Sequence, residues 1–104
     1  LQMAPYLVNG QTYMAVRDLA ALLGAEIVWD GGKQSVSMVK GETRVECSIG
    51  SAIYLLNEKA YTMAEPVVLN QGFTVLPVRT IAELFGTNVG WDGSQQSLVI
   101  ESYE

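Results

Sequence analysis

Two tryptophans are the side chains in this chain of 104 residues that most readily suggest a ligand. An indole that faces solvent offers a flat apolar surface on which a sugar ring can stack. Alternation along each strand pattern, however, places Trp29 on the same face as Ile27 and Trp91 on the same face as Val89. We therefore expect both indoles to fill the core, and we expect Trp29→Ala to cost about 3–5 kcal/mol of stability.

Two arginines and two aspartates are also candidates for chemistry. Arg17 and Arg79 could clasp an anion, because a guanidinium is a planar fork of hydrogen-bond donors. Their equivalent positions favour a structural role instead, in which each ties a helix to a sheet. Asp30 and Asp92 could suggest calcium, but neither belongs to a loop with alternating carboxylates and a distal glutamate. We interpret both aspartates as turn residues.

The chain contains no histidine. Imidazole metal ligands and Ser–His or Cys–His nucleophile pairs are thereby excluded. The single cysteine, Cys47, excludes an internal disulfide. It alternates with Val45 and Ile49, which predicts a buried, unreactive thiol rather than a soft ligand for Cu(I) beside the four scattered methionines. No pair among the 11 acidic residues is singled out. We predict no catalytic residue, no metal site and no cofactor, and hence a protein that is not an enzyme.

These candidate residues recur because the chain contains one pattern twice, 62 positions apart. Residues 8–38 align with residues 70–100 without a gap, and 12 of the 31 aligned positions are identical. An internal repeat of this kind decides the architecture. The repeated residues that we single out as structural are Arg17, Gly24, Trp29 and Asp30 in the first copy, and Arg79, Gly86, Trp91 and Asp92 in the second.

Each copy predicts the same short elements. In the first copy, an Asn-Gly turn at residues 9–10 joins two short strands, residues 15–23 show helical spacing of apolar residues, and Gly24 ends the helix. Two strands follow, at residues 26–29 and 35–38. Between the copies, residues 43–49 alternate as a strand, and residues 52–56 and 60–63 form a second hairpin.

The predicted fold class is α+β. Two internal repeats of short antiparallel strands, each with one short helix packed on a curved sheet, are joined by β-hairpins into one domain. The single domain spans residues 1–104, with repeat one at 6–39, the central hairpins at 40–65 and repeat two at 66–101. Two units of this size are too small to fold independently, so we expect them to share a core.

Charge and hydropathy exclude several partners. The net charge of −5 repels phosphate backbones, so nucleic-acid binding is not expected. No apolar run reaches the roughly 20 residues of a membrane helix, so direct membrane insertion is not expected either. The chain starts with Leu1 rather than methionine, and we expect it to be a piece of a longer protein.

The repeated motifs resemble the copper amine oxidase N-terminal domain-like family, also called the stalk domain, of secreted and surface proteins of Gram-positive bacteria. The resemblance covers residues 6–100. It is carried by the motifs Val-Asn-Gly-Gln-Thr-Tyr at 8–13, Arg17, Leu-Gly-Ala at 23–25 and Trp-Asp-Gly at 29–31, and by their counterparts at 72–79, 83–86 and 91–93. Departures from the family pattern are Ala15 in place of proline, Asn57-Glu58-Lys59 in place of Asn-Gly-Lys, and Asn70-Gln71-Gly72 in place of a second Asn-Gly turn.

The resemblance implies a non-catalytic stalk without copper ligands, located outside the cytoplasm. We therefore expect a structural or interaction module, a stalk or spacer, of a larger bacterial surface or secreted protein. The alternative is a glycan-binding module for cell-wall or extracellular polysaccharide. The expected partners are flanking modules of the parent protein, a second copy paired through the sheet edges at residues 6–8 and 97–101, or a glycan.

Overall fold

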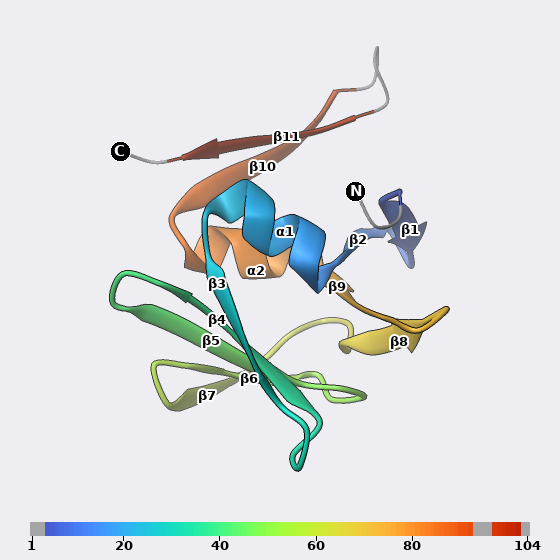
Figure 1. The fold of residues 1–104 in the computed structure, drawn as a ribbon. Helices are drawn as coiled ribbons and strands as arrows, with labels where there is room; N and C mark the ends of the chain where they lie inside the picture. The colour runs from blue at the N-terminus through green and yellow to red at the C-terminus, as the bar shows by residue number, and fades with distance from the viewer. Residues whose placement is uncertain (1–3, 93–96, 103–104) are drawn as a thin grey trace.

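The computed structural model describes residues 4–92 and 97–102, and the fold is α+β (Figure 1). Five elements of the first repeat are followed, after three central strands, by five elements in the same order. Repeat one comprises β1 (Tyr6–Val8), β2 (Gln11–Ala15), α1 (Val16–Leu23), β3 (Glu26–Asp30) and β4 (Ser35–Lys40). The central strands are β5 (Thr43–Ser48), β6 (Ile53–Leu56) and β7 (Lys59–Thr62). Repeat two comprises β8 (Val68–Asn70), β9 (Phe73–Pro77), α2 (Val78–Leu84), β10 (Thr87–Asp92) and β11 (Ser97–Ser102).

The described strands form three antiparallel sheets. A four-stranded sheet has the order β1-β2-β9-β8, a five-stranded sheet has the order β3-β4-β5-β6-β7, and β10 pairs with β11. In the four-stranded sheet the two repeats meet at β2 and β9, where Tyr13 pairs with Pro77 and Ala15 pairs with Val75. Exchanging the repeats converts one of these pairs into the other, so an approximate two-fold axis relates the two copies.

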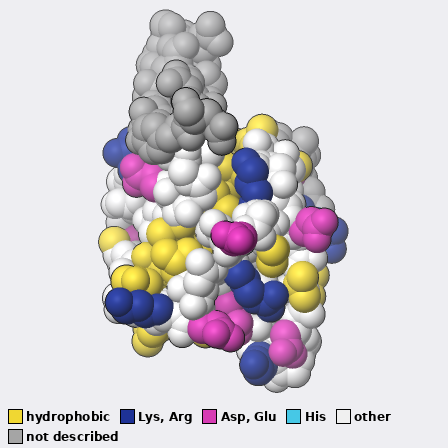
Figure 2. All heavy atoms as spheres, turned by 90° about the vertical axis from the view of Figure 1, so that its left-hand side faces the viewer, with side chains coloured by type: hydrophobic (Ala, Val, Ile, Leu, Met, Phe, Trp, Pro, Cys, Tyr) yellow, Lys and Arg dark blue, Asp and Glu magenta, His cyan; other side chains and the backbone are white. Residues whose placement is uncertain are grey.

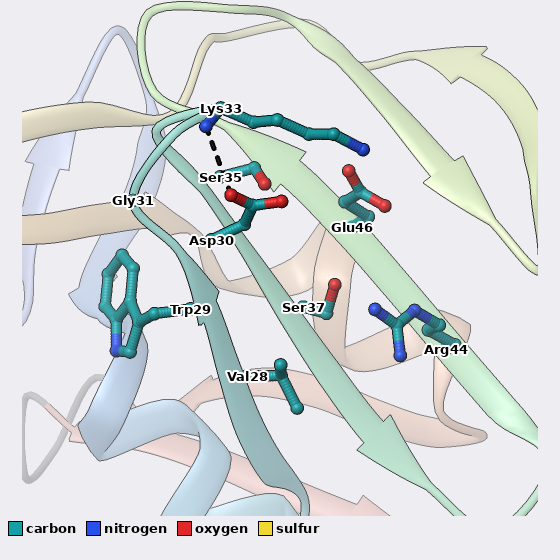
Figure 3. A pocket seen from close by; sticks show the side chains of 9 residues that line it. All are labelled: Val28, Trp29, Asp30, Gly31, Lys33, Ser35, Ser37, Arg44 and Glu46. Carbon is teal, nitrogen blue, oxygen red and sulfur yellow. Dashed lines mark hydrogen bonds between the residues drawn. The ribbon is translucent and has the colours of Figure 1, made fainter.

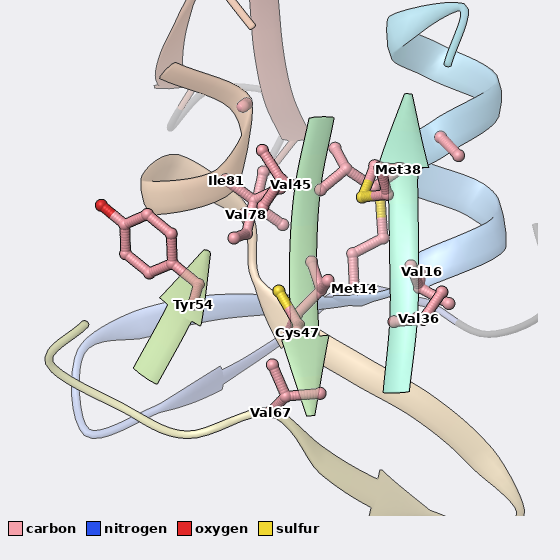
Figure 4. Packing of buried hydrophobic residues seen from close by; sticks show 14 of the residues in the cluster. Met14, Val16, Val36, Met38, Val45, Cys47, Tyr54, Val67, Val78 and Ile81 are labelled. Atoms are coloured by element: carbon pink, nitrogen blue, oxygen red, sulfur yellow. The ribbon is translucent and has the colours of Figure 1, made fainter. Parts of the chain in front are cut away.

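The main core is shared by both repeats and the central strands. α1 and α2 lie next to each other near the centre of the molecule, between β10–β11 and the five-stranded sheet (Figure 1). Figure 4 shows side chains from both helices and from β4 and β5 turned toward one interior, among them Val16, Met38, Val45 and Ile81. Cys47 is buried in this cluster, as its alternation with apolar neighbours predicts.

Two-residue turns with a common backbone geometry join three hairpins. Asn9-Gly10, Asn57-Glu58 and Gln71-Gly72 all have positive φ at both positions, as a type I′ turn requires. Glycine adopts such angles freely, whereas Glu58 does so at φ 74° with a Cβ atom. The departure from Asn-Gly-Lys therefore leaves the turn type unchanged and makes this turn the strained one of the three.

The expected burial of Trp29 is wrong. Trp29 pairs with buried Val36, and Ile27 with buried Met38, so the indole does lie on the core side of the sheet. However, β3 is an edge strand with a neighbour on one side only, and the Trp29 side chain remains 43% exposed. Trp91 occupies the equivalent place in β10, and its side chain lies outside the described part of the structure.

Candidate functional site

A hollow of about 260 Å³ lies beside the exposed indole, and we call it the Trp29 hollow. Repeat one contributes the start of α1 and the end of β3, while repeat two contributes the turn between β8 and β9 and the start of β9. The lining residues are Val16, Arg17 and Trp29 from the first repeat and Gly72, Phe73 and Thr74 from the second. The hollow therefore exists only because the two repeats pack together.

Two polar side chains, Arg17 and Thr74, line the Trp29 hollow. Arg17 is exposed on the first turn of α1, and no described residue binds its guanidinium. Thr74 is 8% exposed and lines the hollow from the second repeat. The residue that precedes α1 is Ala15, which has no side-chain acceptor for the N–H groups of the first turn. The hollow is therefore lined by side chains that can donate hydrogen bonds, and none of its lining residues is acidic.

The identities between the repeats concentrate in this hollow. Of the six lining positions, only Phe73 differs from its equivalent, Gln11. The five identical pairs are Gly10/Gly72, Thr12/Thr74, Val16/Val78, Arg17/Arg79 and Trp29/Trp91. The sequence contains this signal, but the grouping of these positions could not be inferred from it, because the lining combines the helix of one copy with the turn of the other.

The two arginines differ in their surroundings. Arg79 is exposed on the first turn of α2 and makes an interaction of its own, whereas Arg17 has none among the described residues. The structural role that we expect for both arginines therefore remains possible for Arg79. Among the described residues, nothing occupies the exposed Arg17 guanidinium, so this part of the structure leaves it open to a ligand.

A second hollow, of about 280 Å³, lies on the outer face of the five-stranded sheet (Figure 3). Buried Ser35 and Ser37 lie on β4, with Lys33 and Glu46 above one end and Arg44 above the other. The hollow is polar and contains charges of both signs. Its own groups can therefore neutralise one another, unlike the lone cation of the Trp29 hollow.

Asp30 belongs to the wall of this second hollow and shapes the turn that follows β3. Its Oδ1 atom accepts hydrogen bonds from the backbone N–H groups of Gly32 at 3.1 Å and Lys33 at 3.2 Å. The carboxylate therefore acts as a turn former. Asp92 ends β10, and its side chain lies outside the described residues.

The two glycines that we singled out stand just after the helices. Gly24 directly follows α1 and has φ 73°, and Gly86 follows α2 by two residues and has φ 76°. Both angles lie in the left-handed region that glycine tolerates best.

The described residues offer little for covalent or metal chemistry. Within residues 4–92 and 97–102, no three cysteine, aspartate or glutamate side chains are grouped so that they could hold a metal ion. Burial raises the pKa of the Cys47 thiol to about 12, so the nucleophilic thiolate is absent at neutral pH. In the same part of the chain, neither helix is long and apolar enough to cross a membrane.

The fold and the site thus define a class of protein: a duplicated α+β module with a shared core and surface hollows. A search against family models matches the copper amine oxidase N-terminal domain over residues 1–100. The chain therefore belongs to this family, as its motifs indicate, and it is a single such domain rather than the catalytic part of an amine oxidase. No curated protein matches the sequence.

Proposed function

We propose that this domain is a non-catalytic structural and interaction module, a stalk or spacer, of a larger secreted or cell-surface protein of a Gram-positive bacterium. The observation that carries the proposal is the distribution of paired and open strand edges. In repeat one, β4 pairs with β3 on one side and β5 on the other. Its equivalent in repeat two, β11, pairs only with β10 among the described strands. This open edge can accept a strand from a flanking module or from a second copy.

The four-stranded sheet adds two further edges, β1 and β8. Each carries one highly exposed leucine, Leu7 and Leu69, and these leucines are equivalent in the two repeats. Figure 2 shows that, on another face, charged side chains of both signs are interspersed with small hydrophobic areas. A module that contacts neighbours through strand edges needs no broad patch of one charge.

The self-association part of this proposal is tested by multi-angle light scattering of the purified chain over a wide concentration range. We expect a concentration-dependent dimer that weakens in the double variant L7K/L69K, because lysines on edge strands oppose edge pairing. The matched control is Leu22→Lys, which alters an exposed leucine on α1. A strict monomer at every concentration would contradict self-association and would restrict the module to contacts with flanking segments of its parent protein.

The exposure of Trp29 favours a second candidate role, the binding of cell-wall or extracellular polysaccharide. An indole at the rim of a hollow supplies the apolar surface on which a sugar ring stacks. Retention of the chain on immobilised polysaccharides tests this role. We expect Trp29→Ala to abolish retention and Tyr61→Ala to preserve it, since Tyr61 is an exposed aromatic residue on β7 at the opposite edge of the same sheet. Equal retention of both variants would contradict a role for the indole.

A further inference from the structure

We propose that the Trp29 hollow binds a sugar ring that carries a carboxylate, such as a uronic acid residue of an extracellular polysaccharide. This inference rests on the second of the two proposed roles, the binding of a glycan. It specifies the chemistry of the ligand. Two described side chains carry the inference, the exposed guanidinium of Arg17 and the exposed indole of Trp29, which line the same hollow.

The hydrogen-bond donors in the hollow are the reason for proposing a carboxylate on the ligand. The Arg17 guanidinium can hold a carboxylate through two parallel hydrogen bonds. Val16 and Arg17, the first residues of α1, line the same hollow, so the positive end of the helix dipole lies beside it, and Ala15 makes no side-chain cap hydrogen bond there. Asp18, the acidic residue of the same turn, is buried, does not line the hollow and already makes an interaction of its own.

Thr74 adds a polar side chain from the second repeat. It is 8% exposed and lines the hollow, and no buried side-chain nitrogen or oxygen atom of the described residues lacks a hydrogen-bond partner. A carboxylate or ring oxygen of a bound sugar can accept a hydrogen bond from a hydroxyl at this place. The hollow also provides a positive site in a chain whose net charge is −5, which favours an anion at this place over the surrounding surface.

The exposed indole and the size of the hollow are the reasons for proposing a sugar ring. Trp29 presents an exposed aromatic surface beside Arg17, so the ligand must carry an apolar face next to its anionic group. Pockets for drug-sized ligands measure about 300–1,000 Å³. A hollow of about 260 Å³ is slightly smaller and suits one ring of a polysaccharide rather than several.

A single site per chain is expected, although the lining residues recur. The equivalent positions in repeat two include Arg79, which already makes an interaction, and Gln11 in place of Phe73. The second copy of the pattern therefore lacks the free guanidinium on which binding depends. A measured stoichiometry of one sugar per chain agrees with this asymmetry, and a stoichiometry of two would contradict it.

The test follows the indole N–H signals of the chain by NMR during titration with methyl glucuronide, methyl glucoside or acetate. Trp29→Phe identifies the Trp29 signal by its disappearance. We expect methyl glucuronide to shift this signal, whereas the neutral glucoside and acetate shift it much less. Arg17→Gln should weaken binding roughly ten-fold or more, because it removes a charge-assisted pair of hydrogen bonds. Thr74→Val, which preserves side-chain shape, should weaken it less.

The matched control is Lys59→Gln, which removes a cation from β7, at the opposite edge of the sheet from Trp29, and should leave the titration unchanged. If the glucoside shifts the signal equally and Arg17→Gln has no effect, the acidic-sugar inference is wrong while glycan binding stands. If acetate alone reproduces the shift, the hollow recognises a carboxylate without a ring, and the inference is again overturned. If no sugar acts and polysaccharide retention also fails, the glycan role itself is excluded.

Discussion

Met14 and Leu76 lie directly opposite each other where β2 pairs with β9, although they occupy the same place in the two repeats. The approximate two-fold axis therefore passes between these two residues. Both side chains are buried in the main core, which also contains the inner faces of α1 and α2. Each repeat thus completes the interior of the other, and both clusters of buried residues in the described part of the chain contain side chains of both repeats.

This relationship predicts that Leu76→Ala destabilises the whole molecule by about 2–5 kcal/mol, the usual loss for a buried leucine. Because the core is shared, fluorescence and circular dichroism should report one common unfolding transition in urea. The control is Leu69→Ala on the neighbouring strand β8, where the side chain is 59% exposed and the change should stay within about 0.5 kcal/mol. Two separate transitions would contradict a shared core.

Trp29→Ala should destabilise the protein by about 1–2 kcal/mol, less than the 3–5 kcal/mol typical of a fully buried aromatic residue. The reason is that the indole lies on an edge strand and is 43% exposed, so a smaller apolar area is lost from the interior. Urea denaturation measures the change. In the variant Trp91→Phe, iodide should quench the remaining Trp29 fluorescence efficiently, and a strongly protected indole would contradict the assignment.

Glu58→Gly should stabilise the protein by about 1 kcal/mol. Glu58 has φ 74°, and the left-handed region costs a residue with a Cβ atom roughly 1–2 kcal/mol, part of which is offset by the greater freedom of glycine in the unfolded chain. Thermal and urea denaturation provide the measurement. Glu58→Ala is the control, since it removes the charge but retains the Cβ atom. Equal stabilisation by both variants would show that charge rather than backbone strain matters at this turn.

Stability should fall as the pH rises above 9. Burial, aided by the nearby Glu46 carboxylate, raises the pKa of Cys47 from 9.0 to about 12, so the folded state keeps its proton where the unfolded state loses it. The stability that protonated Cys47 contributes is fully present below the pKa of the unfolded state and is lost toward pH 12. Over this range the free energy of unfolding falls by up to about 1.4 kcal/mol per pH unit. Burial also raises the pKa of Tyr13 above 10.0, which adds to the loss at higher pH.

The measurement is urea denaturation at pH 7, 9, 10 and 11. Cys47→Ala should lower stability at neutral pH because it leaves a small cavity, but it should flatten the decline between pH 9 and 10. Tyr13→Phe should make the loss of stability above pH 10 less steep. It should also remove the 2.6 Å hydrogen bond that the Tyr13 hydroxyl donates to the carbonyl oxygen of Pro66. If Cys47→Ala lost stability between pH 9 and 10 as steeply as the parent protein, the titration of Cys47 would not be the cause.

Local patterns in the sequence are sufficient to predict most elements of this fold. Helical spacing and Gly24 define α1, because a short apolar stripe and a left-handed final residue act within a few residues of each other. Alternation likewise predicts that Val45 and Cys47 face inward, since successive side chains of a strand point to opposite faces. The expectation fails at Trp29 because alternation indicates which face a side chain occupies but not whether its strand is at an edge.

By itself, then, the sequence determines the duplication, the turns, the helices and the inward face of each strand, all of which depend on neighbours a few positions apart. Tertiary structure alone decides that β2 pairs with β9, that β3 ends a sheet, and that Arg17 and Trp29 meet Thr74 in one hollow. The β2–β9 pairing and the hollow depend on contacts between residues about 45 to 64 positions apart, and such pairing has no local signature.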